Sequence, residues 1–267
     1  MEIGLYEAVS GMKAQASQQD MISSNLARMS IPGNKRSITA FEIPSDSDLQ
    51  KSSNIPGQVR RLGMKASPLQ ARTVTDFTPA PLEHTGSNFD FAIQGNGFFK
   101  VKEADGSYSY TRDGQFHLTN EGKLVTLDGA QVVNTGDTPM TILPKDATKV
   151  KMDDSGNLNL VDGTKSTKLG SLSMVNIDEP RKSLYLGAPN GRYVVSPDAP
   201  DVATDVKSGL AKGATIVQGS LESSNANSVS EMVSLVNVVR AYEASQKITQ
   251  AEDTLSGDII HAMNATS

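Results

Sequence analysis

The sequence contains no cysteine and no tryptophan, and aromatic residues make up only 5% of its 267 residues. Without cysteine the chain has no disulfide, no thiolate metal ligand and no cysteine nucleophile. A chain of this kind is stable in any redox environment, so the absence of cysteine does not indicate a cellular compartment. Hydrophobic residues reach 37%, which is enough to bury a core. We therefore expect a globular protein with an aliphatic interior.

The chain also lacks long apolar runs and an excess of positive charge. No stretch approaches the roughly 18 apolar residues of a membrane-spanning helix, so we expect no transmembrane segment. The N-terminus, Met1 to Leu5, has neither the basic region nor the apolar region of a cleaved secretory signal. The formal net charge of -5 argues against nucleic-acid binding. The chain is expected to be cytoplasmic or exported without a cleaved signal.

Motifs that support catalysis or cofactor binding are missing as well. Gly95-Asn96-Gly97 resembles a dinucleotide loop but lacks the third glycine and the following helix, so a tight turn is the better interpretation. The three histidines, His84, His117 and His261, are scattered and do not have the spacing of a helical metal pair. The sequence therefore predicts no catalytic, metal or cofactor site, and we expect that the protein is not an enzyme.

Two long segments at the ends of the chain have helical patterns. Ser228 to Met263 contains no proline, starts with the possible capping box of Ser228 and Glu231, and carries apolar residues at alternating intervals of three and four. As a helix it is about 50 Å long, and its narrow stripe requires a partner helix. Ile3 to Met29 shows similar spacing, and Pro32-Gly33 ends it.

The region from Asp76 to about Val217 has the pattern of short antiparallel strands. Turn signals such as Asp105-Gly106, Asp128-Gly129 and Asp162-Gly163 separate short alternating runs. The predicted fold is α+β, with long N- and C-terminal helices paired as an antiparallel coiled coil and an inserted all-β domain; a helical hairpin packed on the domain's own surface is the alternative. The predicted boundaries are 1–33 for the N-terminal helix, 34–75 for an extended polar arm or linker, 76–217 for the β domain and 218–267 for the C-terminal helix.

Three blocks of the sequence, in this order, resemble the axial proteins of the bacterial flagellum, which comprise rod proteins, hook proteins and their relatives. The blocks are Leu5-Tyr6, Ser10–Met12, Asn25–Ala27, Pro32-Gly33 and Lys35-Arg36; then Asp90–Val101 and Tyr110–Gly114; and then Gln218–Asn227, Glu231-Met232 and Arg240–Glu243. The chain departs from the usual pattern at Ser24, Arg28, Ile31 and Asn34. The resemblance is to the FlgF/FlgG type of rod protein, and Asp76–Leu82 is more similar to FlgF.

The resemblance implies a structural subunit of the flagellar basal-body rod, with terminal helices that self-assemble into an inner axial tube, transmit torque and conduct exported subunits. The implied partners are copies of the chain, other rod and hook proteins, the flagellar export apparatus and, as further candidates, the P and L rings. The implied location is the periplasm-spanning rod, reached without a cleaved signal peptide. The alternatives are a hook-type axial protein, a peptidoglycan-acting enzyme with a carboxylate pair, and a receptor-like binding module.

Residues of the terminal segments are expected to pack between subunits, and we expect these segments to be disordered before assembly because ordering them costs about 1 to 2 kcal/mol per residue. The predicted packing residues are Leu5, Val9, Met12, Ala16, Ile22, Asn25, Leu26, Met29, Asn225, Asn227, Met232, Val236, Val239, Ala244, Ile248 and Leu255.

Overall fold

The computed structural model describes residues 2–42, 70–153, 156–177, 180, 184–186, 192–195, 203–205 and 214–265. The chain divides into two compact units. Unit 1 consists of Met1–Ala27, Ser37–Val74 and Asn227–Ser267, and unit 2 of Arg28–Arg36 and Thr75–Ala226. The middle of the predicted arm, residues 43–69, lies outside the described residues, so the predicted domain boundaries stay a prediction.

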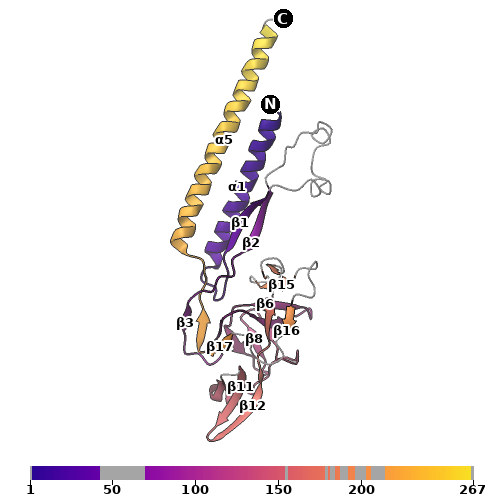
Figure 1. The fold of residues 1–267 in the computed structure, drawn as a ribbon, viewed down its shortest axis with the longest axis vertical. Helices are drawn as coiled ribbons and strands as arrows, with labels where there is room; N and C mark the ends of the chain where they lie inside the picture. Colours follow the sequence, from indigo (N-terminus) through magenta and orange to yellow (C-terminus); the bar gives the residue numbers. More distant parts are fainter. Residues whose placement is uncertain are drawn as a thin grey trace. The chain divides into compact units, whose positions relative to one another are not determined.

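Unit 1 contains the two terminal helices, α1 (Glu2–Arg28) and α5 (Ser228–Ala265), and a two-stranded sheet of β1 (Ser37–Glu42) and β2 (Gln70–Thr75). The helices lie side by side (Figure 1). Asn227 caps α5, because its side-chain oxygen accepts a hydrogen bond from the Ser230 amide at 3.1 Å, one residue before the predicted start of the helix. Neither helix is long and apolar enough, over its described residues, to cross a membrane.

The expected α+β fold with a helical coiled coil is wrong. Among the described residues most elements are strands, with one α-helix at each end of a β region that includes a short 3-10 helix. Two hydrogen bonds connect the helices: Ser245 donates to the Gln15 side chain at 3.3 Å, and Asn25 donates to Glu231 at 3.4 Å. A coiled coil requires a seam of apolar residues that interlock. The apolar stripe of α5 is instead largely exposed.

The two sides of α5 differ in a way that explains this result. Glu231 and Val238 are buried on the side that contacts α1. Val229 and Val236 precede them by two residues each, a rotation of about 200° around the helix axis, and are 68% and 48% exposed. The periodicity predicted an apolar stripe correctly, but α1 lies against the other, more polar side.

Unit 2 is built from short strands, and the pairings described between them are antiparallel. They form a nine-stranded sheet in the order β14-β15-β6-β5-β9-β8-β7 with β13 on β5 and β16 on β13, a three-stranded sheet β10-β11-β12, and the pairs β17-β4 and β18-β3. The elements are β3 (Leu82–His84), β4 (Phe91–Gln94), β5 (Phe98–Lys102), β6 (Tyr108–Thr111), β7 (Phe116–Leu118), β8 (Leu124–Thr126), β9 (Gln131–Val132), the 3-10 helix η1 (Pro144–Lys149), β10 (Val150–Met152), β11 (Asn157–Asp162), β12 (Lys165–Ser171), β13 (Met174–Ile177), β14 (Leu184–Leu186), β15 (Tyr193–Val195), β16 (Ala203–Asp205), β17 (Thr215–Gln218) and β18 (Ser220–Glu222).

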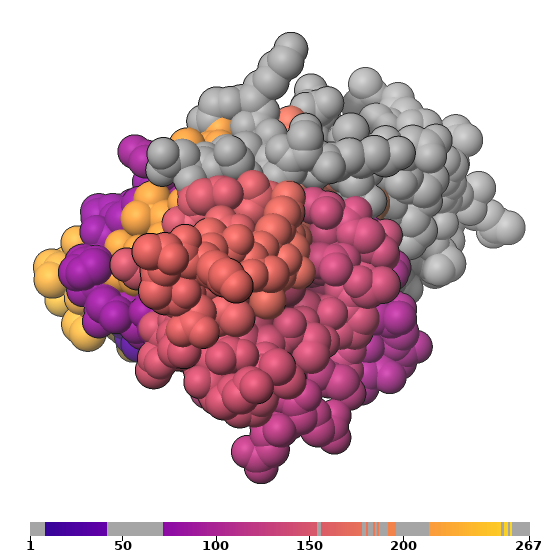
Figure 2. Space-filling view, turned by 90° about the horizontal axis from the view of Figure 1, so that it is seen from below, coloured from indigo at the N-terminus to yellow at the C-terminus, as the bar shows by residue number. Residues whose placement is uncertain are grey.

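The predicted turns connect several of these strands. Gly106, Gly129 and Gly163 have positive φ and follow an aspartate between β5 and β6, β8 and β9, and β11 and β12. The strands enclose two apolar clusters, one around Phe99 and Leu158 and a smaller one around Tyr193. Figure 2 shows one face of unit 2, on which the strand region forms a convex surface. The predicted all-β region is therefore present.

Candidate functional site

Three segments that are far apart in the sequence meet at the carboxylate of Glu222 in β18. Its Oε1 accepts hydrogen bonds from the Lys35 Nζ at 2.6 Å and the Ala80 amide at 3.0 Å, and its Oε2 accepts one from Arg112 at 3.2 Å. Lys35, Arg112 and Glu222 are 2%, 4% and 1% exposed. A buried carboxylate is stable only when it is paired and hydrogen-bonded, and here both conditions are met.

The loop after α1 brings Lys35 to this carboxylate. Gly33 has a φ of 66°, and a Cβ on it would lie 2.3 Å from the Arg112 carbonyl carbon. Only glycine permits this approach. The Gly33 amide donates to the Glu222 carbonyl at 2.6 Å, and the Lys35 Nζ also donates to the Thr78 carbonyl at 2.9 Å. The Pro32-Gly33 sequence that ends α1 thus also makes room for the ion pair.

Arg112 approaches Glu222 from the end of β6. Its guanidinium also donates to the carbonyls of Ile93 at 3.3 Å and Gly95 at 2.8 Å. The guanidinium lies over the Phe98 ring, 5.3 Å from its centroid, which adds a cation-π contact. These contacts fix the side chain in the orientation that meets Glu222.

Asn225 connects the same segments a second time. Its Oδ1 accepts from the Arg36 amide at 2.6 Å, and its Nδ2 donates to the carbonyls of Asp76 at 2.8 Å and Thr78 at 3.2 Å. We call Lys35, Arg112, Glu222 and Asn225 the polar junction. It joins residues 33–36, which follow α1, to residues 76–80 and to residues 222–225, which precede α5.

The electrostatics of the polar junction are those of a structural site. Burial lowers the pKa of Lys35 and of Arg112, and their bonds to the Glu222 carboxylate oppose this shift. Burial also raises the pKa of the neighbouring Tyr193 phenol. Two cations share one carboxylate, so removal of the carboxylate leaves two buried positive charges. The described residues contain no cluster of three or more metal-ligating side chains.

A second buried arginine lies in the nine-stranded sheet. Arg192 donates through Nε and Nη2 to the two carboxylate oxygens of Glu103, each at 2.7 Å, and it also pairs with Asp128. Nearby, burial raises the pKa of Asp113 to about 6, and the Asp128 and Asp90 carboxylates add to the shift.

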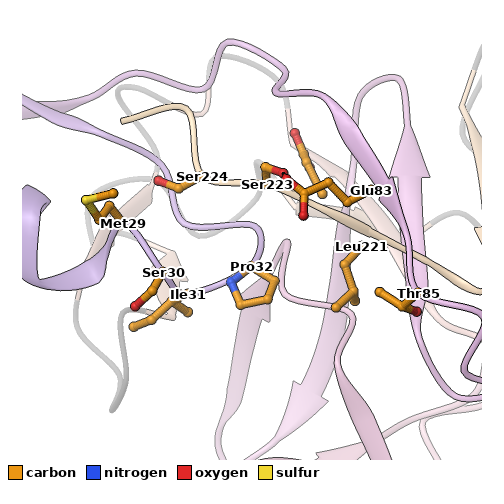
Figure 3. A pocket seen from close by; sticks show the side chains of 10 residues that line it. Met29, Ser30, Ile31, Pro32, Glu83, Thr85, Leu221, Ser223 and Ser224 are labelled. Carbon is orange, nitrogen blue, oxygen red and sulfur yellow. The ribbon is translucent and has the colours of Figure 1, made fainter. Parts of the chain in front are cut away.

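A shallow pocket of about 240 Å³ lies beside the polar junction (Figure 3). Pro32 and Leu221 give it an apolar wall, and Glu83 and Ser223 line its polar side. Ser223 donates to the Glu83 carboxylate at 2.6 Å.

The predicted packing residues do not form one site in the single chain. Asn225 belongs to the polar junction. Asn25 is buried, and its side chain makes two hydrogen bonds with the Ser37 backbone. The side chain of Leu5 lies outside the described residues. Ile22 is buried, and Met12, Ala16, Leu26, Met29 and Val239 are half-buried; Val9, Asn227, Met232, Val236, Ala244, Ile248 and Leu255 are exposed.

Sequence reasoning did not select Lys35, Arg112 or Glu222 as site residues. All three were nevertheless inside the blocks that carry the resemblance, one in each block. No signal singled them out, because the same blocks contain other charged residues, such as Arg36, Asp113 and Glu231. The pairing of the three site residues depends on contacts such as Lys35 to Glu222, 187 residues apart, which periodicity does not reveal.

Three parts of the chain match known protein families. Residues 5–33 match the family described as "Flagella basal body rod protein", residues 92–160 match "Flagellar hook protein FlgE/F/G D1 domain", and residues 217–261 match "Flagellar basal body rod FlgEFG protein C-terminal". Each of the three matched regions contributes to or directly adjoins the polar junction.

Relatives of both rod types align with the chain. The flagellar basal-body rod protein FlgG of Buchnera aphidicola subsp. Acyrthosiphon pisum is 29% identical over 262 residues, covering 94% of this chain and 96% of the relative. The FlgF protein of Mesorhizobium japonicum is 27% identical over the full length of both chains. The FlgF protein of Caulobacter vibrioides is 33% identical over 194 residues, covering 70% of this chain and 71% of the relative. The chain therefore belongs to the flagellar basal-body rod proteins of the FlgF/FlgG type and is a structural subunit of the bacterial flagellar basal-body rod.

Proposed function

We propose that this rod subunit assembles through the exposed apolar side of α5, which packs against copies of the chain and against other rod and hook proteins. The observation that carries the proposal is the exposure of large apolar side chains on that helix. Val229, Met232, Val233, Val236, Ile248 and Leu255 are between 48% and 68% exposed. The first four recur at intervals of three and four, and so they form one stripe.

This stripe is costly to leave in water. Full burial of a Val, Leu, Ile or Met side chain contributes about 1.5 to 3 kcal/mol, so covering half of such a side chain contributes roughly 1 kcal/mol. Contiguous apolar patches of this kind mark protein interaction sites. Ala244, which is also exposed, is small enough to allow close approach of a neighbouring helix. Val9 extends the proposed packing surface to α1, where it is 49% exposed.

We propose that subunits packed in this way form an axial tube that transmits torque and conducts exported subunits. The chain reaches the periplasm through the flagellar export apparatus without a cleaved signal, and unit 2 is available to the P and L rings. Family membership supports these statements, and the absence of a catalytic role is proposed on the same basis.

The substitution Ile248→Asp tests the part of the packing surface formed by Ile248 and Leu255, which faces about 100° away from Val229 around the helix axis. Because Ile248 is 59% exposed, the change should shift the unfolding free energy of the free chain by less than about 0.5 kcal/mol. In an assembled rod it places a charge in an apolar contact and should abolish incorporation into isolated basal bodies. Gln246→Asp, an exposed polar position two residues earlier, is the control and should be incorporated. Normal incorporation of Ile248→Asp contradicts the proposal.

A further inference from the structure

The polar junction closes unit 2 at the two places where the chain enters and leaves it. Unit 2 begins with residues 28–36 and ends at Ala226. The Gly33 amide donates to the Glu222 carbonyl, and the Asn225 amide donates to the Asn34 carbonyl at 3.4 Å. Lys35 and Glu222 add the buried ion pair. The first and last parts of the unit are thus bound directly to each other.

The contacts of the junction are of the type that resists separation. The side chains of Glu222 and Asn225 each bind both the 33–36 segment and the 76–80 segment. Neither segment can therefore separate from residues 222–225 without breaking its hydrogen bonds to both of these side chains. Hydrogen bonds between ionised groups are about twice as strong as neutral ones. Separation also takes the carboxylate away from Lys35 and Arg112, which are 2% and 4% exposed.

We infer that the polar junction is a mechanical clamp: tension applied to the two ends of the chain crosses from residues 33–36 to residues 222–225 and does not reach the strand pairs behind them until the junction breaks. The alternative path runs through the backbone ladders β18-β3, which ends with the pair of Glu222 and Leu82, and β17-β4, which holds residues before it. The inference concerns the single chain, and it does not depend on how the helices pack in the rod.

Pulling the full-length chain by its two termini in an optical trap at constant force tests this inference. The dwell time before the first rupture of unit 2 is the quantity measured. Glu222→Gln keeps the shape of the side chain and removes its charge, and Asn225→Ala removes the second set of bonds from a half-buried position that tolerates truncation more easily. Each should shorten the dwell time about tenfold or more, equivalent to about 1.4 kcal/mol of the rupture barrier.

Two control variants separate a clamp from general stability. Leu158→Ala removes a fully buried side chain from β11, away from the polar junction, and should lower the equilibrium stability because it leaves a cavity. Glu83→Gln changes an exposed carboxylate on β3. Relative to the equilibrium stability that each variant loses, the clamp predicts a larger loss of dwell time in Asn225→Ala and Glu222→Gln than in Leu158→Ala, and it predicts none in Glu83→Gln. If Leu158→Ala shortens the dwell time as much, or the junction variants retain the wild-type dwell time, the inference is wrong.

Discussion

Glu222→Gln is expected to be among the most destabilising conservative changes in the chain. The glutamine keeps one oxygen acceptor but leaves Lys35 and Arg112, both no more than 4% exposed, without a counter-charge. Breaking a buried ion pair by removing one partner costs about 3 to 5 kcal/mol. For a domain of this size each kcal/mol lowers Tm by about 2 to 4 °C, so we expect a decrease of roughly 6 to 20 °C.

Urea unfolding of the purified full chain, followed by far-UV circular dichroism, measures this cost. Glu83→Gln, an exposed carboxylate on the neighbouring strand, is the matched control and should change the unfolding free energy by less than about 0.5 kcal/mol. In the double variant Lys35→Met with Glu222→Gln, the loss of unfolding free energy should be smaller than the sum of the losses in the two single variants. The reason is that the double variant has no buried lysine left without its carboxylate partner. A loss below about 1 kcal/mol for Glu222→Gln, or strict additivity, refutes the electrostatic account of the polar junction.

Two further predictions concern the sheet of unit 2. Gly114→Ala should cost about 3 kcal/mol or more in urea unfolding, because a Cβ would lie 1.6 Å from the Phe91 carbonyl oxygen, whereas Gly106→Ala, which meets open space, should cost only the strain of its positive φ, about 1 to 2 kcal/mol; equal losses would contradict this steric reason. Asp113→Asn should stabilise the chain at pH 7 by up to about 3 kcal/mol. Because the pKa of Asp113 is raised to about 6 in the folded chain, the stability that its protonated carboxyl contributes is fully present below pH 4 and is lost as the pH rises through 6. Thermal unfolding at pH 4 and pH 7 checks this, and a gain that is the same at both pH values would exclude Asp113 as its source.

The local elements of the chain could be predicted from sequence because their causes are local. The absence of proline from 228 to 263 and the three-and-four spacing predicted α5, which spans Ser228–Ala265. Aspartate-glycine pairs predicted turns, and Gly129 and Gly163 provide the positive φ that such turns require. The blocks of resemblance correctly indicated the family.

The side of α5 that α1 contacts could not be predicted in the same way. An apolar stripe shows that a helix has a partner, but it does not say whether the partner belongs to the same chain. Here Glu231 and Asn25 bond across the polar side. A heptad rule counts apolar residues and misses such a contact, so the intrachain coiled coil was a wrong conclusion from a correct pattern.

The polar junction was missed for a related reason. Charged residues are usually solvated, and a sequence does not reveal that Lys35 is buried. Its burial depends on Gly33, whose positive φ allows the loop to approach Arg112, and on a strand that begins more than 180 residues later. Only the folded chain brings the three charges together.

The most direct test of the assembly proposal uses the absence of cysteine from the sequence. In Ile248→Cys the introduced thiol is the only one in the chain, so its rate of reaction with a maleimide reports the exposure of this position alone. We predict rapid labelling in the free chain, where Ile248 is 59% exposed, and labelling at least about tenfold slower in isolated rods, where a neighbouring subunit covers it. Equal labelling rates in the free chain and in the rod would contradict the proposal that Ile248 is buried on assembly.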